Sequence, residues 1–201
     1  MLAHAPVRPE TKRPDIERAA LHLFIRRGLR GTTVRDIAAH ARVAEGTLYR
    51  HWRSKRDLAR SVYRGCAEAV AAEVRRAAAG EQSASAKLGA AIRALFRSAR
   101  DDILLYEMLV MPPSRETHDF LTHTASPALV LAEIVSEGQR RREFGAVDSR
   151  LVSECILGAV HRVALARRLG TLPRRLTQYE QELVVAVPAI LAIRARRRTS
   201  A

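Results

Sequence analysis

The chain has few of the residues on which disulfide-rich, metal-binding and membrane proteins depend. Its 201 residues include only two cysteines, Cys66 and Cys155, too few and too far apart for a disulfide framework or a zinc site. No apolar run is as long as a membrane span, and the residues before Lys12 lack the apolar stretch of a signal peptide. We therefore expect a protein of the reducing cytoplasm, with no metal and no place in a membrane.

Patterns of catalysis and cofactor binding are missing as well. The histidines are scattered and are not paired with carboxylates or cysteines at the spacing of metal ligands. No glycine-rich phosphate loop and no nucleophile motif occurs. We expect no catalytic residues and no cofactor. A helical enzyme that uses a central cavity stays an alternative, which a screen for small-molecule turnover would test.

Aromatic residues make up only 4% of the chain, and no segment alternates apolar and polar residues as a half-buried strand does. Ala, Leu, Arg and Val instead fill segments that Gly and Pro separate. The pattern predicts an all-α fold, large enough for one compact domain and a smaller one. The expected helices span 15–27, 33–40, 45–51, 55–79, 85–99, 102–110, 126–141, 149–169 and 178–196, with a connector at 112–124.

Basic residues outnumber acidic ones by 35 to 21, which gives a formal net charge of +14. The excess is densest near the N-terminus, because residues 1–60 hold 14 Lys and Arg against 6 Asp and Glu. Such a concentration suits a polyanionic partner. An arginine-rich genome could explain part of it, since only Lys12, Lys55 and Lys87 are lysines.

Residues 33–52 hold the most informative pattern in the chain. Apolar residues recur at helical spacing from Val34 to Ala41 and continue through Leu48, while Thr33 and Asp36 form a capping-box-like start. Hydrogen-bond donors and one aromatic ring remain on the other face: Arg35, Thr47, Tyr49, Arg50 and His51. Two short helices, a tight turn and exposed donors are what a helix-turn-helix needs to lie in a DNA major groove.

The flanking segments make the match specific. Upstream, an apolar helix face from Ile16 to Phe24 ends near Gly28, and downstream Ser54 precedes a long helix. From Ile16 to Leu58, about a quarter of the chain, the sequence resembles the N-terminal domain of TetR-family transcriptional regulators. The shared pattern is an Ala-Ala…Leu-Phe helix, a Gly, Thr-Thr-Val…Ile-Ala, then Gly-Thr-Leu-Tyr…His-aromatic…Ser-Lys.

The resemblance implies a three-helix helix-turn-helix domain at residues 1–57, joined to a larger helical ligand-binding and dimerisation domain at residues 58–201. The resemblance also implies which residues contact DNA. Gly46 is one of them. The residues that would hold phosphates, and so position the domain, are Thr33, Thr47, Tyr49, His51 and Lys55. Those that would read base edges are Arg35, Glu45 and Arg50. Tyr49 could instead brace against the first helix, and His51 could be a structural cap.

Three residues depart from the family pattern. Arg42 occupies a turn position that is usually Gly, where a left-handed backbone is common and a bulky residue costs about 1 kcal/mol. Ala44 replaces the usual Ser and removes a side-chain cap, at roughly 1 kcal/mol. Glu45 stands where Lys or Gln is frequent. It either reads a base or stabilises the helix start through the helix dipole.

The family also implies a small-molecule cavity among the middle helices, whose occupation changes the separation of two DNA-binding domains in a dimer. The candidate lining residues, each of which could be ordinary core, are Tyr63, Cys66, Phe96, Tyr106, Met108, Met111, Phe120 and His161. Few are polar, so we expect an apolar effector. Two apolar helix faces would form the dimer through Val152, Ile156, Ala159, Val163, Val184, Val187 and Leu191.

The sequence thus predicts a ligand-responsive repressor that binds a palindromic operator in double-stranded DNA as a homodimer. Within this class, an activator without a small-molecule ligand is the alternative. Outside it, a basic helical module could bind an acidic protein or RNA through charge alone. Sequence-specific binding to spaced half-sites would separate these possibilities.

Overall fold

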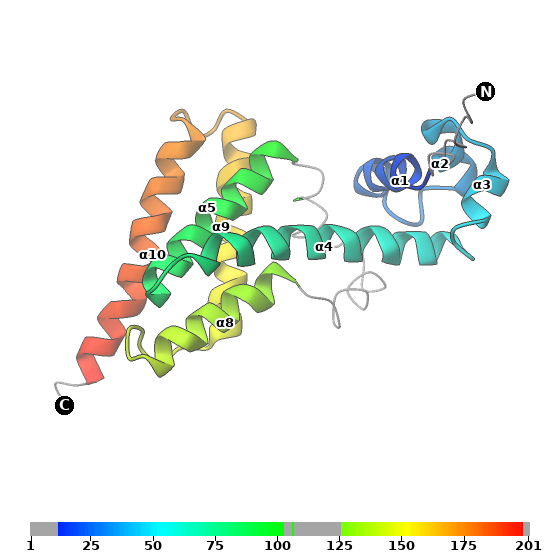
Figure 1. Cartoon of the computed structure of the whole chain (residues 1–201). Coiled ribbons are helices and arrows are strands. Elements are labelled where there is room, and N and C mark those ends of the chain that lie inside the picture. Colours follow the sequence, from blue (N-terminus) through cyan, green and yellow to red (C-terminus); the bar gives the residue numbers. More distant parts are fainter. Residues whose placement is uncertain (1–11, 103–105, 107–125, 199–201) are drawn as a thin grey trace, which may run out of the picture. The chain divides into compact units, whose positions relative to one another are not determined.

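The computed structural model describes residues 12–102, 106 and 126–198, and the regular structure in this part of the chain is helical (Figure 1). The helices are α1 (Arg13–Arg27), α2 (Val34–Ala41), α3 (Glu45–Tyr49), α4 (Lys55–Ala79), α5 (Ala84–Asp101), α8 (Pro127–Arg140), α9 (Ser149–Arg168) and α10 (Leu176–Arg198). The predicted all-α fold is confirmed, and each of these bounds lies within two residues of the predicted one. The predicted helix 102–110 and the connector 112–124 fall almost entirely outside the described residues.

The chain packs as two units that meet inside α4, the first ending at Val62 and the second beginning at Tyr63. α4 itself runs without a break from Lys55 to Ala79, so the boundary is a change of neighbours and not of secondary structure. The predicted functional boundary, between 57 and 58, stays a prediction. None of the described helices has both the length and the apolarity that crossing a membrane requires.

The first unit is built on the apolar face of α1. Ile16, Ala20 and Phe24 share that face at helical spacing, and none of them has exposed surface. Pro14 lies in the first turn of α1, where its missing N–H removes no helical bond. The helix ends at Gly28, whose φ of 71° is a conformation that glycine adopts freely. α1 packs against α2, and α2 packs against α3.

The second unit is organised around α5, which α8, α9 and α10 all contact (Figure 1). Small alanines alternate along α5 with large apolar residues such as Leu88, Ile92 and Leu95, and these side chains are buried. The small residues let neighbouring helices approach closely and fill the core at high density. One such approach is at Gly89, where an added Cβ would lie 3.2 Å from Cγ1 of Val184 in α10.

Candidate nucleic-acid interface

Thr33 and Asp36 form a complete capping box at the start of α2, as predicted. The Thr33 hydroxyl oxygen accepts a hydrogen bond from the Asp36 N–H (3.1 Å), and the Asp36 carboxylate accepts from the Thr33 N–H (2.9 Å) and hydroxyl (2.6 Å). The bonds from Thr33 hold the pKa of the Asp36 carboxyl below its usual range. Because the Thr33 hydroxyl proton goes to Asp36, it could reach a phosphate only if the box opened.

The turn between α2 and α3 has the two local features that its unusual residues predicted. Arg42 has a left-handed backbone, with φ 55° and ψ 47°, and its N–H donates to the carbonyl of Ala39 across 3.2 Å. Ala44 is the N-cap residue of α3 and makes no side-chain cap bond. Glu45 is the acidic residue in the first turn of α3. Its charge suits the positive end of the helix dipole, as the helix-stabilising alternative requires.

α3 rests on a buried apolar base and presents polar side chains outward. Leu48 and Trp52 are only 3% and 8% exposed, which confirms that they are core residues. Tyr49 is 57% exposed, which argues against a ring braced within the unit. The other predicted DNA-contact residues that are exposed are Thr33, Arg35, Glu45, Gly46, Arg50 and His51. The surface of α3 therefore offers donors to a partner without disturbing the core.

Two pairs of side chains on this surface contact each other. Arg50 Nη2 donates a hydrogen bond to Oγ1 of Thr47 across 3.1 Å. The His51 ring lies against that of Trp52, with centroids 5.4 Å apart and an interplanar angle of 58°. The first pair holds a predicted base-reading side chain in place. The second gives His51 a packing role beside its predicted contact with a phosphate, which stays a prediction.

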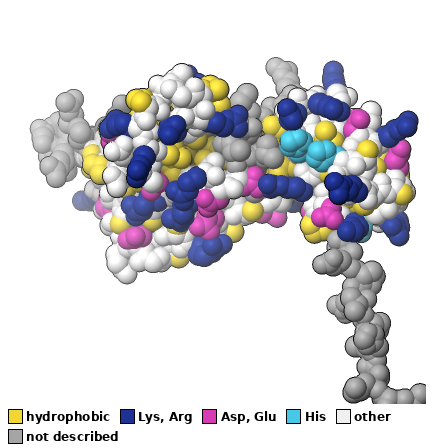
Figure 2. Space-filling model, turned by 90° about the horizontal axis from the view of Figure 1, so that it is seen from above, with side chains coloured by type: hydrophobic (Ala, Val, Ile, Leu, Met, Phe, Trp, Pro, Cys, Tyr) yellow, Lys and Arg dark blue, Asp and Glu magenta, His cyan; other side chains and the backbone are white. Residues whose placement is uncertain are grey.

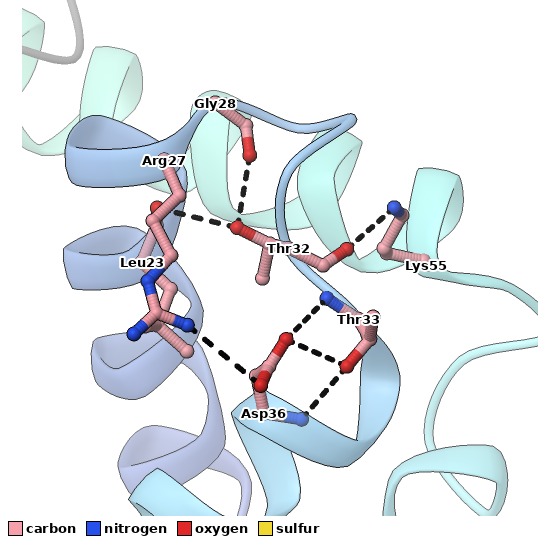
Figure 3. A network of polar contacts seen from close by, with 7 residues as sticks. All are labelled: Leu23, Arg27, Gly28, Thr32, Thr33, Asp36 and Lys55. Carbon is pink, nitrogen blue, oxygen red and sulfur yellow. Dashed lines mark hydrogen bonds and ion pairs between the residues drawn. The ribbon is translucent and has the colours of Figure 1, made fainter.

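A polar network that the sequence did not predict ties the start of α4 to the turn after α1 (Figure 3). Lys55 Nζ donates to the carbonyl oxygens of Leu29 (2.7 Å) and Thr32 (2.6 Å). Thr32 is fully buried, and its hydroxyl lies 2.9 Å from the carbonyl oxygen of Gly28 and 3.3 Å from that of Leu23. The only sequence signal was a lysine in the first turn of α4, where the helix dipole disfavours a cation.

The first unit carries many basic side chains at its surface. The exposed arginines of its helix ends and turns include Arg26, Arg27, Arg30, Arg42 and Arg53. Figure 2 shows lysine and arginine side chains over the visible face of the molecule, with acidic side chains among them. His22 of α1 stacks on His40 of α2, with ring centroids 5.1 Å apart and an interplanar angle of 16°. Desolvation, followed by the charges of His40, Arg26 and Arg18, lowers the pKa of His22.

The predicted effector residues that the structure describes lie within the second unit. Those that are buried are Tyr63, Cys66, Phe96 and Tyr106. The Tyr106 hydroxyl donates to the carbonyl of Leu157 (3.2 Å), and its ring stacks on that of His161 with centroids 6.2 Å apart. Burial raises the pKa of Tyr106. Met108, Met111 and Phe120 lie outside the described residues, so a cavity that these residues share stays a prediction.

An apolar groove of about 410 Å³ lies along α9 and α10, which pack against each other. Five of the predicted dimer contacts line it, namely Val152, Ile156, Ala159, Val187 and Leu191. Its lining also includes Leu151 and Ile190, which are 63% and 61% exposed. Leu151 was not among the predicted contacts, because it precedes the stripe that helical spacing defined.

Four of the predicted dimer contacts also contact the core of the second unit, so their part in a dimer stays a prediction. Ile156 and Leu191 line the groove but are 3% and 5% exposed, so their side chains are taken up within one chain. Val163 and Val184 also pack against the core cluster of the second unit. Helical spacing shows that a helix has an apolar stripe, but not which part of a broad stripe faces α5. Ile156 and Leu191 are buried within one chain, whereas Val163 and Val184 are partly buried, as Val152 and Val187 are.

The buried base, tight turn and exposed donors of α2 and α3 define a helix-turn-helix DNA-binding domain. Residues 16–62 match the family described as bacterial regulatory proteins, tetR family. This part of the chain, about a quarter of its length, therefore carries the N-terminal domain of that family. The match confirms the resemblance to this family that the sequence predicted for the N-terminal segment.

One curated relative and two solved structures show how far the similarity extends. The HTH-type transcriptional repressor KstR2 of Mycolicibacterium smegmatis is 39% identical over 64 residues, or 32% of this chain and 31% of KstR2. The match thus spans about a third of that relative.

The solved structures match over most of both chains. FadR of Bacillus subtilis, a transcriptional regulator in complex with stearoyl-CoA, has a TM-score of 0.71 and 21% identity over 87% of this chain and 98% of FadR. AibR, in complex with isovaleryl coenzyme A and operator DNA, has a TM-score of 0.69 and 17% identity over 86% of this chain and 96% of AibR. At these identities the likeness is one of fold.

Proposed function

We propose that the chain is a transcriptional repressor that binds a palindromic operator as a homodimer and releases it when a small molecule binds to the second unit. The observation that carries the proposal is α3, where Tyr49 and Arg50 are exposed above the buried Leu48 and Trp52. Such side chains can reach phosphates and base edges while the helix stays anchored. The name of the curated relative, a repressor 39% identical over 64 residues, supports repression over activation.

The decisive experiment is the selection of DNA by the purified protein. Fragments retained from a random-sequence duplex pool should contain a palindrome whose half-sites lie about 10 base pairs, or a multiple of that, apart. Anisotropy should then show binding to the selected duplex at least about a thousandfold tighter than to an unrelated one. Equal affinity for every DNA, or for RNA and acidic protein, would favour the basic helical module instead.

The sign of regulation needs its own measurement. Transcription in vitro from a promoter that contains the selected palindrome should fall when the protein is added. A rise would favour the activator alternative, and turnover of a small molecule by the protein would favour the helical enzyme. Neither Cys66, which is buried, nor Cys155, which is exposed, is part of a disulfide, which suits the reducing compartment expected for such a regulator.

The groove along α9 and α10 supports the homodimer. Leu151 and Ile190 expose large apolar surfaces beside the apolar groove. Burying such a patch against a second protein surface is more favourable than leaving it in water. A two-fold axis through the groove would set the same residues of two chains against each other, as symmetric dimers require. Val152, Ala159 and Val187 would then contribute to both halves of the interface.

We propose an acyl-CoA thioester as the effector. FadR and AibR, which share the fold, were solved with stearoyl-CoA and isovaleryl coenzyme A. In the second unit the apolar side chains of Phe96 and Tyr106 are buried and suit an acyl tail better than a charged ligand. Stearoyl-CoA, isovaleryl-CoA and free CoA should be compared for release of the selected duplex. Release by a thioester but not by CoA is expected, and release by none of them would contradict this assignment.

A further inference from the structure

We propose that Lys55 is a positioning residue for DNA recognition, which acts through the backbone carbonyls that it holds and not through a phosphate. The inference rests on the proposed function and revises the phosphate role expected from the sequence. Lys55 Nζ spends two of its three N–H groups on the carbonyl oxygens of Leu29 and Thr32, at 2.7 and 2.6 Å. Bonds from a charged donor are among the strongest in proteins. We call these two bonds the Lys55 clamp.

The position of Lys55 in its own helix supports the clamp. Lys55 is the first residue of α4, and the Ser54 hydroxyl accepts a bond from the Asp57 N–H (3.1 Å) to cap that end. A cation there opposes the positive end of the α4 dipole. At the other side of the clamp, Leu29 lies just beyond the carboxyl end of α1, where a cation is favoured. The bonds from Lys55 to Leu29 and Thr32 therefore compensate for a lysine at a position where the dipole of α4 disfavours a cation.

The clamp fixes Thr32, which precedes the N-cap residue of α2. Thr32 is fully buried and is held twice, by Lys55 at its carbonyl and by its own hydroxyl at the carbonyls of Gly28 and Leu23. The next residue, Thr33, is the N-cap of α2. The start of α2 is thus attached to α1 and to α4 at the same point (Figure 3).

From that point the attachment reaches the recognition helix by direct packing. α2 contacts α3, and Arg27 of α1 pairs with Asp36 in the first turn of α2 (3.7 Å). A shift of Thr32 would therefore change where α2 begins and tilt the helix on which α3 rests. Base readout depends on placement to within a fraction of an ångström, whereas attraction to phosphates does not. Loss of the clamp should accordingly harm operator binding more than binding to unrelated DNA.

The test uses two variants of the full chain, of which the first removes the Lys55 clamp and the second removes the hydroxyl bonds that hold Thr32 from its other side. Lys55→Met removes the ammonium group and keeps the length of the side chain. Thr32→Val removes only the hydroxyl of a residue with no exposed surface, which no DNA can touch. Arg53→Ala is the matched control, because it removes one exposed positive charge two residues before Lys55 without touching the clamp. Fluorescence of Trp52, the single tryptophan, reports whether the first unit is folded.

The readout is affinity for the selected duplex at several salt concentrations. Because both variants loosen the hold on Thr32, each should bind about tenfold more weakly, with the same slope of log affinity against log salt as wild type. Loss of a phosphate contact would instead make the slope shallower by about 0.9. That slope change for Lys55→Met, together with unchanged binding by Thr32→Val, would overturn the proposal. If Lys55→Met does not fold, unchanged operator affinity of Thr32→Val overturns by itself the claim that the anchoring of Thr32 supports base readout.

Hydrogen exchange separates a failure of the clamp from a failure of the proposed function. Without any DNA, Lys55→Met should speed amide exchange at Asp36 and Ile37, at the start of α2, more than in the middle of α1. Unchanged exchange would overturn the clamp even if the protein selects a palindrome. A wild-type protein with no sequence preference would instead overturn the proposed function and, with it, the role of Lys55 in recognition.

Discussion

The guanidinium of Arg50 donates a hydrogen bond from Nη2 to Oγ1 of Thr47, which lies 3.1 Å away and one turn earlier. A long exposed side chain loses rotamer freedom when it binds, and a partner on the same helix removes part of that freedom beforehand. Thr47 thereby holds the residue that is best suited to a bidentate contact with guanine. This pair is the most specific reason to expect that α3 reads sequence.

Arg50→Ala should therefore weaken binding to the selected duplex by about 1–3 kcal/mol and weaken binding to unrelated DNA much less. Tyr49→Phe is the matched comparison, because loss of a phosphate contact should lower both affinities by the same factor. Fluorescence anisotropy on the two duplexes measures this directly. If Arg50→Ala lowers both affinities equally, Arg50 holds a phosphate and does not read a base.

One variant, Glu45→Gln, tests whether the Glu45 carboxylate stabilises the helix or reads a base. Because Ala44 provides no side-chain cap, we expect the Glu45 carboxylate to stabilise the start of α3 through the helix dipole. Glu45→Gln should then lower the melting temperature of the first unit and leave the selected sequence unchanged. An unchanged melting temperature with a relaxed preference at one base pair of each half-site would show that the carboxylate accepts from cytosine.

Ala44→Ser provides the control for Glu45. A serine at the N-cap should restore the missing bond and stabilise the first unit by about 1 kcal/mol. In that background, Glu45→Gln should lower the melting temperature less, since the helix start no longer depends on one charge. Equal losses in both backgrounds would mean that the effect of Glu45 does not arise at the helix start.

Local signals account for what could be predicted from the sequence, and long-range contacts for what could not. The capping box of Thr33 and Asp36 joins residues three apart, and the left-handed turn at Arg42 follows from its place in a two-helix pattern. The Lys55 clamp joins residues 26 and 23 positions apart. The periodic pattern of apolar residues in a sequence does not indicate contacts between residues so far apart. For the same reason, the stripe containing Ile156 and Leu191 was visible, but its burial against the core was not.

The groove along α9 and α10 gives a sharp test of the dimer. Leu151→Asp should yield monomers in sedimentation at micromolar concentration, because it would bury an unpaired carboxylate in the interface. Leu169→Asp is the matched control: Leu169 is also 63% exposed, but it follows the end of α9 and does not line the groove. Leu169→Asp should remain dimeric. A monomeric wild-type protein, or a dimeric Leu151→Asp variant, would contradict the assignment.

The stacked pair of His22 and His40 predicts how the stability of the first unit depends on pH. Desolvation and nearby positive charges lower the pKa of His22 from the usual 6.5, so the folded unit binds fewer protons than the unfolded chain as the pH falls below that value. The stabilisation is therefore complete above about pH 6.5 and is lost as the pH falls through the lower, folded pKa.

Trp52 fluorescence provides the measurement, because the only tryptophan lies in the first unit. Thermal melts between pH 7.5 and pH 5 should show a falling midpoint in wild type and a smaller fall in His22→Gln, which cannot gain the proton. At pH 7.5 the two proteins should differ little, since His22 is neutral there and Gln keeps a polar side chain at a partly exposed position. Replacing His40 by Gln should also reduce the fall, because the charge on His40 is the second cause of the shift. Identical pH dependence in wild type and His22→Gln would mean that the stacked pair does not couple proton binding to folding.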